Sequence, residues 1–222
     1  ERIFYVAEAF RRGVTVDVVV VLRDKIHLNC GASRVARTSD AVRVTDTQGN
    51  TAQYDHVIFA CHSDQALALI DTPTRAEKEV LGNIHYQPNR VVLHSDTSFM
   101  PIRKAAWSSW VYLCDGHNDK EPVISLSYWM NNLQPLDTDH PIIVTLNPGR
   151  EPAPHLVHND HMFAHPIFDQ SAIAAQQRIG EIQGSDRLWF CGAWQRYGFH
   201  EDGLSSAVTL AQRLGATIPW AS

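Results

Sequence analysis

The sequence has 222 residues, of which 44% are hydrophobic and 19% are charged, and a formal net charge of −5 at pH 7. A chain of this length and composition can bury one substantial core, or two lobes that share an interface. The acidic balance, without a basic run longer than Arg11-Arg12, excludes a nucleic-acid-binding surface, and no apolar run approaches the roughly 20 residues of a membrane-spanning helix.

The first part of the chain contains one predicted helix and one segment that stays open. Apolar residues recur at helical spacing from Ile3 to Phe10, which predicts a helix that ends at Gly13. The valine-rich residues 14–22 fit a strand, because β-branched residues favour strands, and they also fit a continuing buried helix.

A β-meander is predicted next. Its strands cover Lys25–Asn29, Ala32–Arg37, Ala41–Asp46 and Thr51–Tyr54, with a turn at Gln48-Gly49-Asn50. The continuous apolar run Val57–Cys61 then indicates a parallel strand covered on both faces. His62-Ser63-Asp64 can cap the helix that follows this strand.

The middle of the chain predicts a mostly antiparallel sheet between two helices. A capping box at Thr74-Arg75-Ala76-Glu77 begins a short helix that ends at Leu81. Asp169 can cap a second helix, which carries Ile173, Ala174, Ile179 and Ile182 and is closed by Gly184. Between them lie extended runs separated by polar turns: Val91–Leu93, Ala106–Leu113, Val123–Trp129 and Ile142–Leu146.

The C-terminal stretch has the pattern of a ligand site. The apolar run Arg187–Cys191 predicts another buried parallel strand, which leads into glycine-rich turns at Gly192 and Gly198–Gly203. Such turns before a helix offer unpaired N–H groups and a positive dipole end to an anionic or electron-rich ligand. The helix is predicted from apolar residues at helical spacing: Leu204, Ala207, Val208, Ala211 and Leu214.

The same stretch resembles a known family. The segments Phe190–Trp194, Gly198–Gly203 and Ser205–Ala207 are similar to the C-terminal flavin-binding motif of the FAD-dependent amine oxidase superfamily. Together with ACHSDQAL at residues 60–67, they look most like bacterial proteins described as predicted NAD/FAD-binding oxidoreductases. The resemblance covers most of the chain. It implies a mixed α/β fold with a partial FAD/NAD(P)-binding Rossmann-like domain and an antiparallel-sheet substrate domain of amine oxidase type.

The resemblance implies which residues contact FAD. Gly192 and Ala193 match positions where the backbone passes the pyrophosphate and the ribityl chain. Ala32 takes the position that pairs with adenine, and Cys61 ends a strand against the cofactor. The residues that would meet the flavin end of the cofactor are Trp194, Phe199, His200 and Ser206, with Glu201, Asp202 and Gly203 in the turn that faces the N1/O2 edge.

The resemblance also implies residues on the substrate side. Arg90 falls at the head of the strand where many amine oxidases have a lysine that holds a water near flavin N5. Because arginine keeps its charge, we expect Arg90 to orient water or bind an acidic group and not to act as a base. Arg90 and His200 are therefore the candidate catalytic residues. Phe163, His165 and Phe168 match the strand and turn that cover the substrate side.

A histidine-rich segment offers an alternative that we do not favour. His155, His158, His161 and His165 resemble a zinc-binding cluster in density, but Pro152, Pro154 and Pro166 argue against a helix that presents them on one face. We therefore predict no metal site.

The sequence lacks one element that the resemblance requires. Neither a G-X-G-X-X-G turn nor the acidic residue about 20 positions later is present, although this pair holds the diphosphate and ribose in dinucleotide-binding folds. In the superfamily that unit lies upstream of the position of Glu1. We therefore expect a C-terminal portion of a longer flavoenzyme that binds FAD weakly by itself. The alternative is a stable, non-catalytic binding module.

These observations lead to one overall prediction. Residues 1–70 and 185–222 form a discontinuous FAD-binding domain, and residues 71–184 form the substrate domain. The expected reaction is the oxidation of a C–N or C–C bond of a small amine, or of an apolar or acyl compound, by hydride transfer to flavin. The cysteines at 30, 61, 114 and 191 are far apart, which favours free thiols in a cytoplasmic protein.

Overall fold

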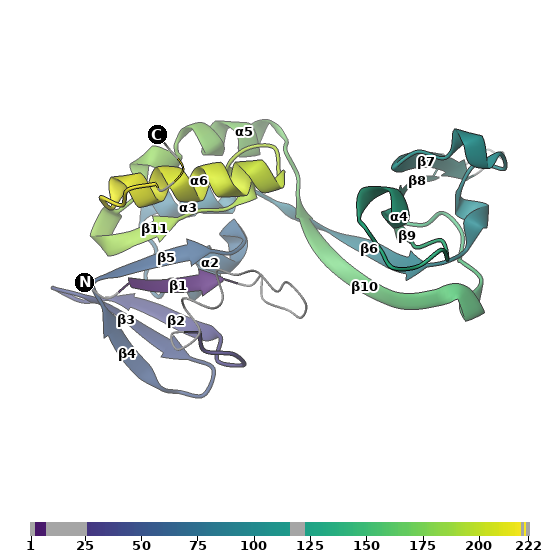
Figure 1. Cartoon of the computed structure of the whole chain (residues 1–222). Helices are drawn as coiled ribbons and strands as arrows, with labels where there is room; N and C mark the ends of the chain where they lie inside the picture. Colours follow the sequence, from purple (N-terminus) through teal and green to yellow (C-terminus); the bar gives the residue numbers. More distant parts are fainter. Residues whose placement is uncertain (1–2, 8–25, 116–122, 219, 221–222) are drawn as a thin grey trace. The chain divides into compact units, whose positions relative to one another are not determined.

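The computed structural model describes residues 3–7, 26–115, 123–218 and 220 (Figure 1). The chain divides into two compact units. Residues 1–86 and 166–222 make up the first unit, and residues 87–165 make up the second. Each unit is described by itself below. In the part of the chain so described, no helix has the length and apolar character needed to cross a membrane.

A parallel sheet forms the centre of the first unit. Its strands are β1 (Ile3–Ala7), β5 (His56–Ala60) and β11 (Leu188–Phe190), in the order β1-β5-β11. Val57 pairs with Leu188 and Phe59 pairs with Phe190, so residues far apart in the sequence become neighbours. The two apolar runs predicted to be buried parallel strands are thereby confirmed.

The helix predicted from Ile3 to Gly13 is wrong over its described part. Residues Ile3–Ala7 form β1, which pairs in parallel with β5. Ile, Phe, Tyr and Val all favour strands, and pairing with an apolar strand outweighs the helical spacing of so short a segment. Residues 8–25 lie outside the described part of the chain, and so does the open segment 14–22.

An antiparallel meander packs on one face of the parallel sheet. Its strands are β2 (Ala32–Arg37), β3 (Val42–Asp46) and β4 (Thr51–Tyr54), as predicted apart from Ala41. The strand predicted at Lys25–Asn29 is wrong over residues 26–29, because Leu28 and Asn29 form a turn and Asn29 has a φ of 55°. Such a left-handed conformation interrupts extended pairing.

Helices α2 (Ser63–Leu69), α3 (Arg75–Gly82), α5 (Gln170–Gln177) and α6 (His200–Arg213) complete the first unit. The predicted capping box of α3 is present: Thr74 Oγ1 accepts from Glu77 N, and Glu77 Oε2 accepts from Thr74 N. Buried residues of α3 and α5 join the same core as the strands. The first unit therefore extends beyond the boundaries at residues 70 and 185 that the sequence indicated.

Helix α5 is shorter than predicted and buries a different face. Asp169 caps it as expected by accepting from Ala172 N, but the α-helix ends at Gln177. A 3₁₀ turn, Ile179–Glu181, follows, and a second one at Ser185–Arg187 leads into β11. Ala172 and Ala175 are buried and Ile173 is exposed, so small residues allow α5 to lie close to the core. In α6, Leu204 is likewise exposed and Leu210 is buried.

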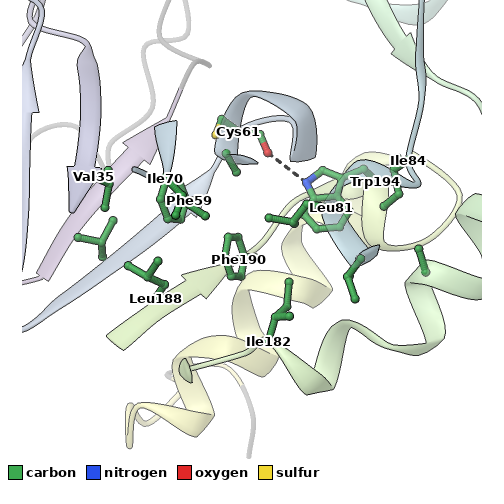
Figure 2. Packing of buried hydrophobic residues seen from close by; sticks show 14 of the residues in the cluster. Val35, Phe59, Cys61, Ile70, Leu81, Ile84, Ile182, Leu188, Phe190 and Trp194 are labelled. Atoms are coloured by element: carbon green, nitrogen blue, oxygen red, sulfur yellow. Dashed lines mark hydrogen bonds between the residues drawn. The ribbon is translucent and has the colours of Figure 1, made fainter. Parts of the chain in front are cut away.

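In the core of the first unit, inward-facing residues of both sheets pack against the helices. The rings of Phe59 and Phe190 stack with centroids 5.2 Å apart (Figure 2). Val35 of the meander and Leu81 of α3 belong to the same buried cluster. Helix α6 packs on the other face of the parallel sheet, where Leu210 meets Ile58 and Cys191 in a second cluster. The alternation of side chains along β5 thus covers both faces.

The second unit is built on one sheet in the order β10-β6-β9-β8-β7. The pairs β6–β9, β9–β8 and β8–β7 are antiparallel, as predicted. β7 begins at Trp110 and not at Ala106, because Lys104–Ala106 form a 3₁₀ turn. The elements are β6 (Tyr86–His94), β7 (Trp110–Asp115), β8 (Val123–Trp129), α4 (Met130–Leu133), β9 (Ile143–Leu146) and β10 (Val157–Pro166), with further 3₁₀ turns at Thr97–Phe99 and Pro154–Leu156.

A polar chain is buried in the second unit. His94, Ser127 and Thr145 have no exposed surface. The N–H of Asp96 donates to His94 Nδ1 at 3.1 Å, so Nε2 carries the ring proton and donates to Thr145 Oγ1 at 2.8 Å. Thr145 Oγ1 lies 2.7 Å from Ser127 Oγ. Burial lowers the pKa of His94, which keeps this imidazole neutral and the chain intact.

Candidate functional site

The carboxyl ends of β5 and β11 lie side by side, and the residues that follow them are tied together. Trp194 Nε1 donates to the carbonyl oxygen of Cys61 at 3.0 Å (Figure 2). The Trp194 side chain is only 4% exposed and belongs to the core. The indole therefore fixes the turn after β11 to the end of β5, and its contact with the flavin end of the cofactor stays a prediction.

The hydroxyl of Ser206 links this turn to α6 by two hydrogen bonds. Ser206 Oγ accepts from Gly192 N at 2.9 Å and donates to Gly203 O at 2.7 Å. Gly203 faces the turn, since a Cβ at this position would lie 3.6 Å from Ala193 N. Gly192 has a φ of 154°, and a Cβ there would lie 2.5 Å from Trp194 Nε1. The absence of a side chain at Gly192 therefore leaves room for the Trp194 indole, whereas a Cβ at Gly203 would make only an ordinary contact with the turn.

A buried carboxylate shapes the loop before α6. Asp202 Oδ2 accepts from Tyr197 N at 3.2 Å and from Phe199 N at 3.1 Å. Asp202 is buried, so its charge is used to hold the loop and to cap the helix. Phe168 also packs against this loop, since its ring lies 3.3 Å from the position of a Cβ on Gly198.

The N-terminus of α6 offers free donors. Asp202 N and Gly203 N donate to Phe199 O, so two of the three turn positions implied by the resemblance are engaged within the chain. The N–H groups of His200 and Glu201 have no acceptor among the described residues. Phe199 beside them is 69% exposed. Unpaired N–H groups, a helix dipole and an exposed ring suit an electron-rich aromatic ligand.

The predicted cofactor residues are thus largely brought together. Contacts join Cys61 and Gly192–Trp194 to the first two turns of α6. Ala32 begins β2 in the same unit and packs against the shared core. Its assignment to adenine stays a prediction. The predicted residues that lie in the second unit are Arg90, Phe163 and His165, which are described by their own surroundings.

Arg90 is held by two carboxylates. Its Nη1 lies 2.7 Å from Glu151 Oε1, and its Nη2 lies 2.7 Å from Asp160 Oδ2. These hydrogen bonds raise the pKa of Arg90 and lower the pKa of both carboxyl groups. The water-orienting role is compatible with the pairing and stays a prediction.

The other substrate-side residues lie on or next to β10. Phe163 is exposed, and its ring packs against His161 with centroids 4.6 Å apart. His165 is also exposed, whereas Phe168 belongs to the first unit. In the described part of the chain, no group of three or more His, Cys, Asp or Glu side chains could hold a metal ion. His158 and His161 point to opposite faces of β10, since their separation is odd.

One feature of this edge is missing from the sequence-based list of site residues. His62, the residue after Cys61, stacks on Tyr86 with ring centroids 4.4 Å apart and an interplanar angle of 20°. Tyr86 OH accepts from Ser63 N at 2.9 Å and lies 3.2 Å from Ser63 Oγ. Burial raises the pKa of Tyr86. The position of His62 directly after a buried parallel strand is the signal that could have identified it.

A family model connects this architecture to known proteins. The model described as "Flavin containing amine oxidoreductase" matches residues 6–150. No curated protein sequence shows significant similarity to the chain.

Solved structures share the fold. Cyclohexylamine oxidase from Brevibacterium oxydans IH-35A has a TM-score of 0.58 and 12% identity, over 90% of this chain and 52% of that one. A putrescine oxidase variant redesigned in cofactor binding has a TM-score of 0.58 and 12% identity, over 90% of this chain and 51% of that one. A fatty acid isomerase from P. acnes has a TM-score of 0.54 and 14% identity, over 85% of this chain and 48% of that one. The chain thus spans about half the length of these structures.

Proposed function

We propose a function from one premise: the chain belongs to the flavin containing amine oxidoreductase family. Members of this family use FAD. The residues at the carboxyl ends of β5 and β11 fit that cofactor, because they combine a glycine turn, free N–H groups and an exposed aromatic ring. We infer that this chain holds the flavin end of FAD there.

The chemistry would be divided between the cofactor and the chain. When bound, FAD supplies the two-electron oxidation of a C–N or C–C bond of the substrate. The N–H groups of His200 and Glu201 would stabilise negative charge on the ring, helped by the dipole of α6. Asp202 and Ser206 keep these donors in place through the hydrogen bonds they make to the loop and to Gly192. The two unpaired N–H groups are the observation that carries this assignment.

The second unit is proposed to face the substrate. Arg90 would orient a water, and Phe163 and His165 would contact a small molecule. Trp110 and Tyr112 on β7 are exposed, which favours a substrate with a substantial apolar part. The names of the similar structures include amine oxidases and a fatty acid isomerase, so amines and acyl compounds are both candidates. The free cysteines of the described chain support a cytoplasmic location as part of this proposal.

FAD binding can be tested on the chain with backbone NMR. We expect FAD to shift the amide signals of His200 and Glu201. The affinity should be weak, because the sequence has no G-X-G-X-X-G turn. Ser206→Ala should weaken binding further by releasing Gly192, and Ser39→Ala on an exposed turn is the matched control. Shifts confined to residues outside 192–206 would contradict the proposed site.

The reaction can be tested by anaerobic bleaching of the flavin absorption band. Protein loaded with FAD should bleach with a member of a panel that contains primary amines, polyamines and unsaturated fatty acids. Bleaching by one class identifies the bond that is oxidised. Binding of FAD without bleaching by any compound of the panel would favour the non-catalytic binding module.

A further inference from the structure

A short loop of the second unit presents apolar and basic side chains to solvent. The loop covers residues 101–107 and lies between the 3₁₀ turn at Thr97–Phe99 and β7. Ile102 has a relative exposure of 105%, the highest value among the exposed large hydrophobic residues of the described chain. Its neighbours Arg103 and Lys104 are exposed as well. The side chain of Ile102 therefore adds nothing to the core of the unit.

The shape of this loop is fixed from its base. Trp107 Nε1 donates to the carbonyl oxygen of Pro101 at 2.7 Å, which joins the two ends of the loop. The 3₁₀ turn Lys104–Ala106 lies within it. The ring of Trp107 also packs edge-on against Trp129 of β8, with centroids 5.2 Å apart. The loop is thus anchored to the sheet, and its exposed side chains project from a preformed turn.

The loop carries a positive charge that no carboxylate neutralises. Neither Arg103 nor Lys104 has an ion-pair partner among the residues that the structure describes. Lys104 Nζ lies 5.9 Å from the centroid of the Trp107 ring, which stabilises the ammonium group and leaves its charge in place. Residues 97–114 contain neither Asp nor Glu, although the chain has a formal net charge of −5. The loop is therefore a positive site on an acidic chain.

This combination of side chains matches the surface of an anionic lipid bilayer. Arginine and lysine remain at the level of the lipid phosphates, while an adjacent apolar side chain enters the boundary with the acyl chains. Tryptophan favours the same interfacial depth. An acidic protein surface would complement Arg103 and Lys104 but would place Ile102 against charged groups. Charge complementarity together with the apolar side chain thus favours a membrane over an acidic protein.

We propose that the loop 101–107 docks this protein on anionic lipid bilayers, with Ile102 inserted at the headgroup boundary and Arg103 and Lys104 on the lipid phosphates. The contact is peripheral and reversible, because one inserted side chain and two cations supply modest affinity. The assignment does not depend on the flavin site, since the loop belongs to the second unit and carries its charges with or without FAD.

Co-sedimentation with lipid vesicles tests the proposal on the full chain. We expect the protein to pellet with vesicles of phosphatidylcholine that contain about one third phosphatidylglycerol, and to remain in the supernatant with pure phosphatidylcholine. Binding should fall when the salt concentration is raised from about 0.1 M to about 1 M, because the ions screen the contact between the basic side chains and the lipid phosphates.

Variants separate a specific loop from general electrostatic attraction. Arg103→Gln with Lys104→Gln should lower the partition coefficient about thirtyfold, since each cation near an anionic surface contributes about a factor of five. The matched control is Arg43→Gln with Lys78→Gln, which removes the same charge from exposed positions of the first unit and should retain most of the binding.

The apolar part of the contact needs its own variant. Ile102→Ser should lower the partition coefficient about tenfold, because its side chain no longer leaves water on binding. Leu28→Ser, at another exposed apolar residue, should leave it unchanged. The unmutated chain gives a measurement that does not depend on variants. A nitroxide-labelled lipid in anionic nanodiscs should broaden the amide NMR signals of residues 102–104 more than those of Arg43 and Lys78.

Three results would overturn the proposal. The first is the absence of co-sedimentation with the anionic vesicles. The second is an equal loss of binding in the loop variants and in their controls, which would indicate general attraction. The third is a dimer of the vesicle-free protein that Ile102→Ser dissociates in sedimentation velocity, which would assign the loop to a second copy of the chain.

Discussion

Glu77 illustrates how one side chain can serve two elements. It is fully buried although it is a carboxylate. Oε2 accepts from the N–H and the hydroxyl of Thr74, and Oε1 pairs with Arg37 of β2. The same group therefore caps α3 and joins this helix to the meander.

Replacing Glu77 measures how much its two sets of contacts contribute to the stability of the fold. Glu77→Gln keeps the size of the side chain but removes the charge that Arg37 needs, and we expect the free energy of unfolding to fall by about 2–4 kcal/mol. Urea denaturation measures the change. Glu79→Gln is the control. Glu79 forms solvent-accessible ion pairs with Arg75 and Arg178, so its replacement should lower the free energy of unfolding much less. Equal losses in the two variants would rule out burial as the cause.

At the level of residues, the sequence predicted which segments of the chain meet. It did not predict the contacts that individual side chains make there. The segments around Gly192 and Gly203 do meet, as the resemblance implied. Trp194 lies in the core and Asp202 holds the loop, and the contacts of both residues with flavin stay predictions. Side-chain direction depends on packing partners from β5 and α2, which a local pattern does not contain. The stack of His62 on Tyr86 was hidden for the same reason, because the two residues lie 24 positions apart in the chain.

Among the elements, the turn between β3 and β4 depends on one carboxylate. Asp46 accepts from the thiol of Cys30, from the side chain and backbone of Asn50, and from Gln48 N. These hydrogen bonds, that of Cys30 first, lower the pKa of Asp46 from 3.8 to about 2. Asp46 thus fixes both the hairpin turn and the segment that leads into β2.

The lowered pKa of Asp46 predicts a pH dependence of stability. Because the folded-state pKa is below the unfolded value, ionised Asp46 stabilises the fold above pH 3.8, and this contribution is lost as the pH falls towards 2. Asp46→Asn should therefore reduce the loss of stability between pH 4 and pH 2, measured by urea midpoints. Asp137→Asn, at an exposed position of the second unit, should leave the profile unchanged. An identical profile for both variants would contradict the prediction.

The turn before β11 leaves no room for a side chain at Gly184. Gly184 has a φ of 79°, and a Cβ there would lie 2.7 Å from the ring of Trp189. Gly49 in the meander has a similar φ of 88° but no atom within 4 Å of such a Cβ. The two glycines therefore share a conformational requirement and differ in packing.

These two glycines form a matched pair for mutagenesis. Gly49→Ala should lower the free energy of unfolding by about 1–2 kcal/mol, which is the cost of a left-handed residue with a Cβ. Gly184→Ala should cost about 1–3 kcal/mol more, because Trp189 must move. Urea denaturation of both variants gives the difference. The predicted clash does not exist if the two losses are equal.

The elements that could be predicted were those with a strong local signal. The capping box of α3, strands β2 to β4 of the meander and the apolar parallel strands all carry such signals, and they are present. β1 was missed because its conformation depends on β5, which lies far along the chain. The buried face of α5 was missed because alanines pack there in place of the larger Ile173.

For the whole molecule, the second unit is an insertion into the first. The chain leaves the first unit after Tyr86 and returns at Pro166. Ile167 N donates to His85 O at 2.8 Å, so the two crossing points are adjacent. The two buried apolar clusters of the first unit contain only residues of that unit.

This arrangement predicts that the first unit folds without the second. Replacing residues 87–165 by a short Gly-Ser linker should leave a cooperative urea transition and a dispersed NMR spectrum, because no buried residue of either cluster is removed. The intact chain is the reference. A broad transition with collapsed NMR dispersion would show that the first unit needs the second.

The insertion also has a consequence for synthesis on the ribosome. Cys61 and Trp194 are hydrogen-bonded partners 133 positions apart, whereas every strand of the second unit comes from one continuous segment. The second unit can therefore fold while the ribosome is still translating residues that β5 requires as neighbours. The β11 side of β5 stays unpaired until residues 188–190 have been translated, so this strand edge is open to other pairing for longer than the strands of the second unit are.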